Sequence, residues 1–511
     1  MTKFNKPQTI KEQLVSHTDV MENYEGALAF KLDALTDLYI RSASTLVGEP
    51  KYYESAKDAD SELLKSIHKV IETDPEFVLQ LAVYCREKLY LRSVPMMLVA
   101  EFANSKAVGK VPNARKYVTR VIQRADELTE LVSYQFARNK VVPRTKVKLP
   151  MMLKYGISDA FSKFDEYQFS KYNREGVVKL RDVLFLTHPK SDPERQMLYD
   201  KITQDTLEMA ETWEVMRSTG KMTWHDVVNN IFHKDGKIFN YMAQLRNLRN
   251  CLQDNTVTNN DILLLCKMLS DKNAVLHSKQ FPFRFLSAYR EAQKVVHPLT
   301  PQVVDALEMA IQYSIENVPK LEGTTLIASD VSGSMESSIS KNSSIERYDI
   351  GLVLSMMAHR FCAVSMTGIF GDTWEVVPLA KYSTGILANT MKLRSMEGKV
   401  GYSTNGYKVI EYLLEKDMKV DRIMIFTDCQ MWDSSGYDKT FAETFIKYQR
   451  RYPNVKLYCF DLSGYGNIMI PQNTKNVCLI GGWSDKVFDF VKAFEETGKN
   501  TVIQEIKAIK P

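Results

Sequence analysis

Several features common in secreted, membrane and redox proteins are missing from this sequence. The seven cysteines include no Cys-x-x-Cys pair, so neither a zinc ribbon nor a redox motif is predicted. No run of 18 apolar residues occurs, and the N-terminal residues lack the apolar core of a signal peptide. We therefore expect a cytoplasmic protein with reduced, buried thiols and no membrane-spanning helix.

Motifs of several enzyme classes are also missing. The chain has no Gly-x-x-x-x-Gly-Lys-[Ser/Thr] phosphate loop and no Gly-x-Ser-x-Gly nucleophile elbow. Gly464-Tyr-Gly466 lacks the third glycine of a dinucleotide-binding motif. The C-terminal part contains one histidine, His359, in a mostly apolar stretch, which we interpret as structural and not as a general base. The sequence therefore predicts a protein that is not an enzyme.

The pattern of apolar residues divides the chain near residue 320. Its 511 residues exceed one compact core, so two or more domains are expected. After an N-terminal tail over 1–20, apolar residues recur at helical spacing, and Asp-Pro and Val-Pro pairs separate these stretches. We predict helices joined by short loops over 21–320. No clean internal period is visible, and a degenerate solenoid of helical hairpins also fits this pattern.

After residue 320, short β-branched runs alternate with helical stretches. The runs are 324–330, 364–370, 421–428, 455–462 and 476–482. Such alternation predicts a mostly parallel sheet covered by helices on both faces. Ligands of these sheets bind beyond the carboxyl ends of the strands, so a functional site is expected there.

Oxygen-bearing side chains follow two of these runs. The first run leads into Asp330-Val-Ser332-Gly-Ser334, where alternate residues point the same way. A later run ends at Asp428, and Thr404 stands at the start of a helix between them. Carboxylates and hydroxyls without Cys or His suit a hard divalent cation, which favours Mg²⁺, with Mn²⁺ as the alternative.

This set of five residues, in this order, resembles the metal-ion-dependent adhesion site (MIDAS) of von Willebrand factor A domains. The resemblance implies a Rossmann-like A domain over 321–511 whose cation takes water and an acidic group from a partner. Asn405 stands where an Asp often follows the Thr, a change that leaves the Thr404 hydroxyl in place. Two alternatives stay open: the side chains only cap backbone groups, or the site acts by shape without a metal.

Basic side chains concentrate in the helical part. Between residues 106 and 154 there are about four basic residues for each acidic one, and a second basic cluster covers 171–190. Tyr167, Tyr172 and Phe185 are interleaved with the second cluster. Cations and aromatic rings together offer phosphate contacts and stacking surfaces for unpaired bases. The alternative is a solvated helix face with the aromatic rings in the core.

The helical part also contains motifs that resemble those of a known family. These are 23–33, 181–190, 245–250 and 281–283, followed by the Asp330 site. They are similar to the TROVE family, which includes the Ro ribonucleoprotein autoantigen and bacterial Ro-like (Rsr) proteins, over about residues 20 to 500. The resemblance implies HEAT-like helical hairpins bent into a ring that the A domain closes.

The resemblance also implies a function. The family is an RNA-binding scaffold for RNA quality control, which binds Y-like small RNAs and the single-stranded 3′ ends of misfolded noncoding RNAs. It implies a monomer to which an exoribonuclease or another protein is tethered through RNA or the metal site. By position, the residues expected to contact RNA are Lys171, Arg174, Arg181, His188 and Lys190, with the neighbouring Arg138, Lys140, Arg144, Lys146 and Lys148. The alternatives are a metal-dependent protein-adhesion or assembly adaptor and, third, metal-dependent hydrolysis of RNA ends.

Overall fold

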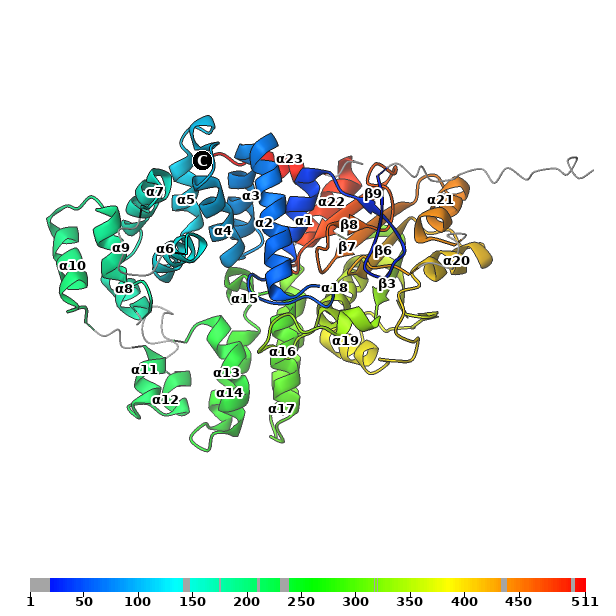
Figure 1. Ribbon diagram of the computed structural model, residues 1–511. Coiled ribbons are helices and arrows are strands. Elements are labelled where there is room, and N and C mark those ends of the chain that lie inside the picture. The colour runs from blue at the N-terminus through cyan, green and yellow to red at the C-terminus, as the bar shows by residue number, and fades with distance from the viewer. Residues whose placement is uncertain are drawn as a thin grey trace, which may run out of the picture.

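The computed structural model describes residues 19–140, 148–173, 176–208, 212–229, 239–316, 318, 320–432, 439–497 and 501–511. Helices make up most of the chain before residue 320, and a sheet with covering helices follows (Figure 1). The predicted fold class, a helical region followed by a von Willebrand A-type domain, is confirmed.

The helices of the first part form where capping residues precede apolar stripes. In α2, the Ser55 side chain accepts a hydrogen bond from the Asp58 backbone, and Leu63, Ile67 and Val70 form a buried stripe at helical spacing. The helices are α1 Ala34–Ala43, α2 Ala56–Thr73, α3 Pro75–Glu87, α4 Ser93–Ala103, α5 Ala114–Val121, α6 Asp126–Arg138, α7 Met151–Phe161, α8 Glu166–Tyr172, α9 Leu180–Thr187, α10 Pro193–Gln204, α11 Trp213–Ser218, α12 Trp224–Asn229, α13 Tyr241–Gln253, α14 Asn259–Leu269, α15 Lys272–Ser278, α16 Pro282–Gln293 and α17 Thr300–Ser314.

A six-stranded sheet forms the centre of the A domain. Its order is β5-β4-β3-β6-β7-β9, parallel except for the antiparallel edge pair β4–β5. Every residue of β6 is buried, as a parallel strand covered on both faces requires. The strands are β3 Leu321–Asp330, β4 Cys362–Phe370, β5 Trp374–Val376, β6 Arg422–Thr427, β7 Lys456–Asp461 and β9 Val477–Gly481, and the helices are α18 Arg347–Phe361, α19 Ile386–Arg394, α20 Tyr407–Glu415, α21 Phe441–Arg451, α22 Val487–Thr497 and α23 Val502–Lys507.

The helical part begins and ends against this A domain. Figure 1 shows the helices following a curve that leaves the A domain at α1 and returns to it at α16 and α17. At the first end, α1 packs on β9, and the Tyr39 hydroxyl donates to the Gly481 carbonyl at 3.0 Å. At the second end, α16 packs on α18, where Arg290 forms a two-pronged ion pair with the buried carboxylate of Asp349. The A domain therefore closes the curve of helices into a ring.

A small second sheet differs from the helical pattern expected near the N-terminus. Strands β1 Val20–Glu22 and β2 Leu28–Lys31 form a hairpin, and β2 pairs antiparallel with β8 Asn467–Ile468 of the A domain. The first described residues therefore belong to the surface of the A domain.

The chain end and the cysteines complete the fold. At the end of α23 and just beyond it, the backbone carbonyls of Lys507 and Ile509 accept hydrogen bonds from the Gln80 side chain, so the C-terminal segment lies along α3. All seven cysteines are buried and unpaired, as predicted. Among the helices described, none combines the length and the apolar character needed to cross a bilayer.

Candidate metal centre and nucleic-acid interface

Three loops meet at the carboxyl edge of the sheet and bring the predicted metal ligands together. The Gly333 amide after β3 donates to the Tyr402 carbonyl at 2.9 Å, which joins the first loop to the loop of Thr404. The Trp432 amide after β6 donates to the Thr404 carbonyl at 2.8 Å, which joins the third loop to the second. All five predicted metal-site residues are buried at this edge.

The first loop arranges its oxygens as the alternate spacing predicts. The Asp330 carboxylate accepts from the Ser332 amide at 2.9 Å and from the Thr427 hydroxyl at 2.5 Å. The hydroxyl oxygens of Ser332 and Ser334 lie 3.2 Å apart. The carboxylate is thereby held in one orientation beside two hydroxyl groups.

Asp428 is the side chain that most clearly fits a cation. It is 0% exposed, one carboxylate oxygen accepts from the Gln430 amide at 3.1 Å, and the other has no hydrogen-bond partner. Burial raises the pKa of Asp428, and burial together with the charge of Asp428 raises the pKa of Asp330 to about 7. A buried carboxylate oxygen without a partner is costly, and a divalent cation would satisfy it.

The remaining donors favour a hard ion. Across the described ranges, no three His, Cys, Asp or Glu side chains form a metal-binding group, so a metal here depends on two acids and three hydroxyls. Such a set fits Mg²⁺, which prefers oxygen and keeps several of its waters. Asp330, Ser332, Ser334, Thr404 and Asp428 are the residues that would hold the ion.

Two residues around this centre were not predicted from the sequence. Asp461 at the end of β7 is 0% exposed, and burial raises its pKa to about 6. The buried ammonium of Lys51 donates to the Gly464 carbonyl at 2.9 Å, and burial lowers its pKa to about 8. The end of a further parallel strand was an available signal for Asp461. No local pattern indicated Lys51, which comes from the helical part.

The second basic cluster presents an exposed face on α9. Arg181, Phe185 and His188 follow one another at spacings of four and three residues, which places them on one side of the helix. All three side chains are exposed, and Phe185 is 58% exposed. Lys190 is exposed directly beyond His188, whose backbone ends the helix in the left-handed region with a φ of 49°. We call Arg181, Phe185, His188 and Lys190 the α9 face.

Aromatic rings and cations also meet beside this helix. The guanidinium of Arg124 lies 4.6 Å from the centre of the Tyr172 ring, and the Lys171 ammonium lies 5.8 Å from the Tyr167 ring and 5.9 Å from the Tyr172 ring. The Tyr172 ring packs partly against the core. The core position that the sequence left open as an alternative therefore applies in part to Tyr172, while both rings lie against cations.

Several cations of the first basic tract are paired with acids. Arg138 donates to the buried carboxylate of Glu101 at 2.7 Å, and Glu101 also contacts His68 at 2.8 Å. Arg120 and Arg124 form ion pairs of 2.7 and 2.8 Å. Arg138 therefore stabilises the packing of α4 against α6, which limits its reach toward a phosphate. Arg144, Lys146 and Arg174 lie outside the described residues.

Comparison with known families covers both parts of the chain. A model of the TROVE domain matches residues 38–228 and 203–303, and a model of the Ro60 vWA domain matches residues 324–494. The chain belongs to the TROVE family. The family match and the Ro-like fold support an RNA-binding component of a ribonucleoprotein.

Individual relatives of this TROVE chain are distant. The crystal structure of the Deinococcus radiodurans RO (RSR) protein superposes with a TM-score of 0.58 at 16% identity, over 88% of this chain and 98% of that one, which shows a shared fold. Telomerase protein component 1 of Rattus norvegicus is 23% identical over 321 residues, and that of Mus musculus is 23% identical over 327 residues. The matches cover 46% and 47% of this chain but span only 12% of each relative's length.

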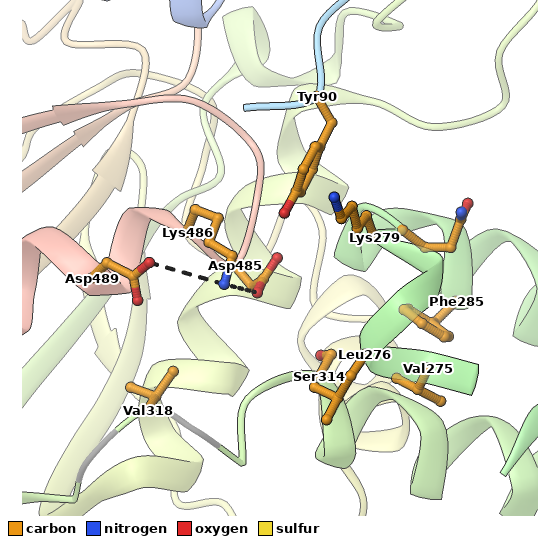
Figure 2. Close-up of a pocket in the computed structure, with 11 residues that line it drawn as sticks. Tyr90, Val275, Leu276, Lys279, Phe285, Ser314, Val318, Asp485, Lys486 and Asp489 are labelled. Carbon is orange, nitrogen blue, oxygen red and sulfur yellow. Dashed lines mark ion pairs between the residues drawn. The ribbon is translucent and has the colours of Figure 1, made fainter. Parts of the chain in front are cut away.

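A pocket of the TROVE ring lies where the helical part faces α22. Figure 2 shows Tyr90, Lys279, Asp485 and Lys486 around it, together with residues of α15 to α17. The Lys279 ammonium lies 5.3 Å from the centre of the Tyr90 ring, and Lys486 is 3.7 Å from Asp485 and 3.9 Å from Asp489. Acids and bases are balanced here, so this pocket lacks the single sign of charge that attracts phosphate.

Proposed function

We propose that this TROVE protein is an RNA-binding scaffold of a cytoplasmic ribonucleoprotein that works in RNA quality control. Its ligands in this proposal are Y-like small RNAs and the single-stranded 3′ ends of misfolded noncoding RNAs. The observation that carries the proposal is the α9 face, where two exposed cations flank an exposed aromatic ring. Cations neutralise phosphates, and an exposed ring stacks with any unpaired base, so neither contact requires a particular sequence.

The absence, among the described residues, of ion pairs at the two cations of the α9 face supports binding of an anion there. Within the described ranges, no acidic side chain forms an ion pair with Arg181 or Lys190, in contrast to Arg120, Arg124 and Arg138. An unpaired exposed cation loses little when it meets a phosphate, whereas a paired one must first leave its carboxylate. The α9 face is therefore the described part of the basic clusters that is best prepared for RNA.

The closed ring supports selection of RNAs with free ends. A structured duplex is wider than a single strand, so binding that depends on an enclosed path favours RNAs with an unpaired end. The scaffold acts as a monomer in this proposal, because α1 and α16 both pack on the chain's own A domain. An exoribonuclease or another protein would then be brought to the scaffold through the bound RNA.

The metal centre has a binding role in the proposed function. Asp330, Ser332, Ser334, Thr404 and Asp428 would hold Mg²⁺, which supplies a positive charge that an acidic group can bind. His359, the histidine of the A domain, is a buried structural residue whose ring bonds the Ser365 hydroxyl at 2.8 Å. We propose no catalytic step at this centre.

A second candidate function rests on two exposed aromatic residues beside the metal centre. Tyr402 is 54% and Trp432 is 46% exposed, and both belong to the loops that hold Thr404. Aromatic residues next to a cation favour a protein contact, which is the metal-dependent adaptor. Mg²⁺-dependent binding of a protein that persists after removal of all RNA would favour this candidate.

Gel-shift affinities for one hairpin RNA with and without a single-stranded 3′ tail test the main proposal. We expect tighter binding of the tailed RNA and a steep loss of affinity when the salt concentration rises from 50 to 200 mM, since about 10³-fold losses accompany several phosphate contacts. Equal, weak binding of both RNAs would overturn the proposal. Binding that consumes the RNA in the presence of Mg²⁺ would replace it with hydrolysis of RNA ends.

A further inference from the structure

The turn of the N-terminal hairpin lies over the metal centre. The side-chain amide of Asn23 donates to the Met431 carbonyl at 2.6 Å, and the Tyr24 amide donates to the Gln430 side chain at 2.9 Å. Both acceptors belong to the loop that begins at Asp428. Because β2 also pairs with β8, the turn is fixed on the A domain from two sides.

Glu25 stands at the tip of this turn, next to the two residues that bond the Asp428 loop. Its half-buried carboxylate accepts a hydrogen bond from the Tyr53 hydroxyl and lies close enough to Asp428 for the two charges to repel. The Ser334 hydroxyl lies near the same Tyr53 hydroxyl. Tyr53 therefore stands between the hairpin acid and a predicted metal ligand.

The charges around this point are unbalanced. The carboxylate of Asp428 lies close enough to those of Asp330 and Glu25 for their like charges to repel. The cation whose charge acts on Asp428 is the buried Arg347, which bonds the Ser337 hydroxyl. In the part of the chain that the structure describes, no cation forms an ion pair with Glu25. A divalent ion would balance these charges.

We propose that Glu25 is the acidic partner of the metal centre, supplied by the same chain, and that a bound divalent cation holds the β1–β2 hairpin on the A domain. This inference rests on the proposed metal centre. Mg²⁺ keeps several waters when it binds protein, so an acid one side chain away from a ligand is placed to accept hydrogen bonds from those waters. Tyr53 is a positioning residue, because its hydroxyl bonds the Glu25 carboxylate and lies near Ser334.

A metal centre that is completed by Glu25 has a different role from the one expected of a site that binds a partner protein. A cation whose charge is already matched by Glu25 would have little need of an acidic group from another protein. It instead connects the β1–β2 hairpin, which leads into α1 of the helical part, to the loops of the A domain. The metal is thus part of ring closure.

Calorimetric titration of the full chain with MgCl₂ tests the proposal. Loss of an outer partner of a metal site weakens affinity by about 10–100-fold, so we expect Glu25→Gln to bind Mg²⁺ at least about 10-fold more weakly than the unaltered chain. Glu22→Gln is the matched control, because Glu22 is an exposed acid on the same hairpin. We expect it to bind Mg²⁺ like the unaltered chain.

Hydrogen exchange of residues 19–31 supplies the second measurement. We expect Mg²⁺ to slow exchange of the hairpin in the unaltered chain and in Glu22→Gln, and to leave Glu25→Gln unaffected. Equal Mg²⁺ affinity and equal hairpin protection in both variants would overturn the inference and leave the metal centre intact. Asp330→Ala separates the two ideas, because unchanged Mg²⁺ binding in that variant would overturn the metal centre and the inference with it.

Discussion

Removal of the two α9-face cations, Arg181 and Lys190, should weaken RNA binding. The size of this loss of affinity can be calculated from the expected dependence of binding on salt concentration. Arg181 and Lys190 are exposed and lie at the two ends of the face. If each neutralises one phosphate of a single strand, the slope of log K against log salt falls by about 0.7 for each. At 0.15 M salt each contact then contributes about fourfold, and Arg181→Ala with Lys190→Ala lowers affinity by about 15-fold.

The assay is a salt titration of binding to a tailed hairpin RNA. The control is Lys267→Ala with Lys447→Ala, which removes the same charge from exposed positions on α14 and α21. We expect the control to keep the slope of the unaltered chain, while the α9-face variant loses about 1.4 from it. Equal slopes for the two double variants would refute the idea that the α9 face contacts phosphate, because general electrostatic attraction alone would then explain binding.

Three further predictions concern the metal, the ring and pH. Mg²⁺ should raise the melting temperature of the unaltered chain but not of Asp330→Ala, and an equal rise in both would contradict the metal assignment. Arg290→Ala leaves the Asp349 carboxylate without its closest cation and should lower the free energy of unfolding by about 3 kcal/mol in urea denaturation, whereas a loss under about 1 kcal/mol would contradict the role of this pair in ring closure. Burial, with the charges of Lys381 and Arg360, lowers the pKa of His359 from 6.5 to about 4, so stability present above pH 6.5 is lost as the pH falls toward 4. Melting temperatures of His359→Asn should fall less over that window, and an equal fall would show that other groups control it.

The A domain and its metal loops were predictable because their signals are local. The strand that ends at Asp330 and the strand that ends just before Asp428 each combine an apolar run with an acid at its end. Parallel pairing then places both acids at one edge without further information. The N-terminal hairpin was not predictable in this way, because its strands have three and four residues and β2 pairs with a two-residue strand far along the chain.

The RNA-contacting residues of the two basic clusters were the part of the candidate site that the sequence predicted least well. Composition counts a basic residue whether or not an acidic residue pairs with it in the folded protein. Arg138 and Lys190 were therefore equally good candidates for RNA contact in the sequence. In the structure Arg138 contacts the buried Glu101 on another helix, while Lys190 stays exposed. The acids that pair with Arg120 and Arg138 precede them by more than thirty residues, and only the packing of α3 to α6 brings them together.

The two ends of the helical curve are held to the A domain by different chemistry. At the α16 end the Arg290–Asp349 pair is permanent, since both charges belong to the chain. At the α1 end the proposed link through Glu25 requires an ion that can leave. A ligand present at 100 times its dissociation constant stabilises the state that binds it by about 2.7 kcal/mol, which is comparable to the pair at the other end. Withdrawal of Mg²⁺ should therefore loosen the hairpin and α1 while α16 stays in place, and hydrogen exchange that rises equally at both ends would contradict this asymmetry.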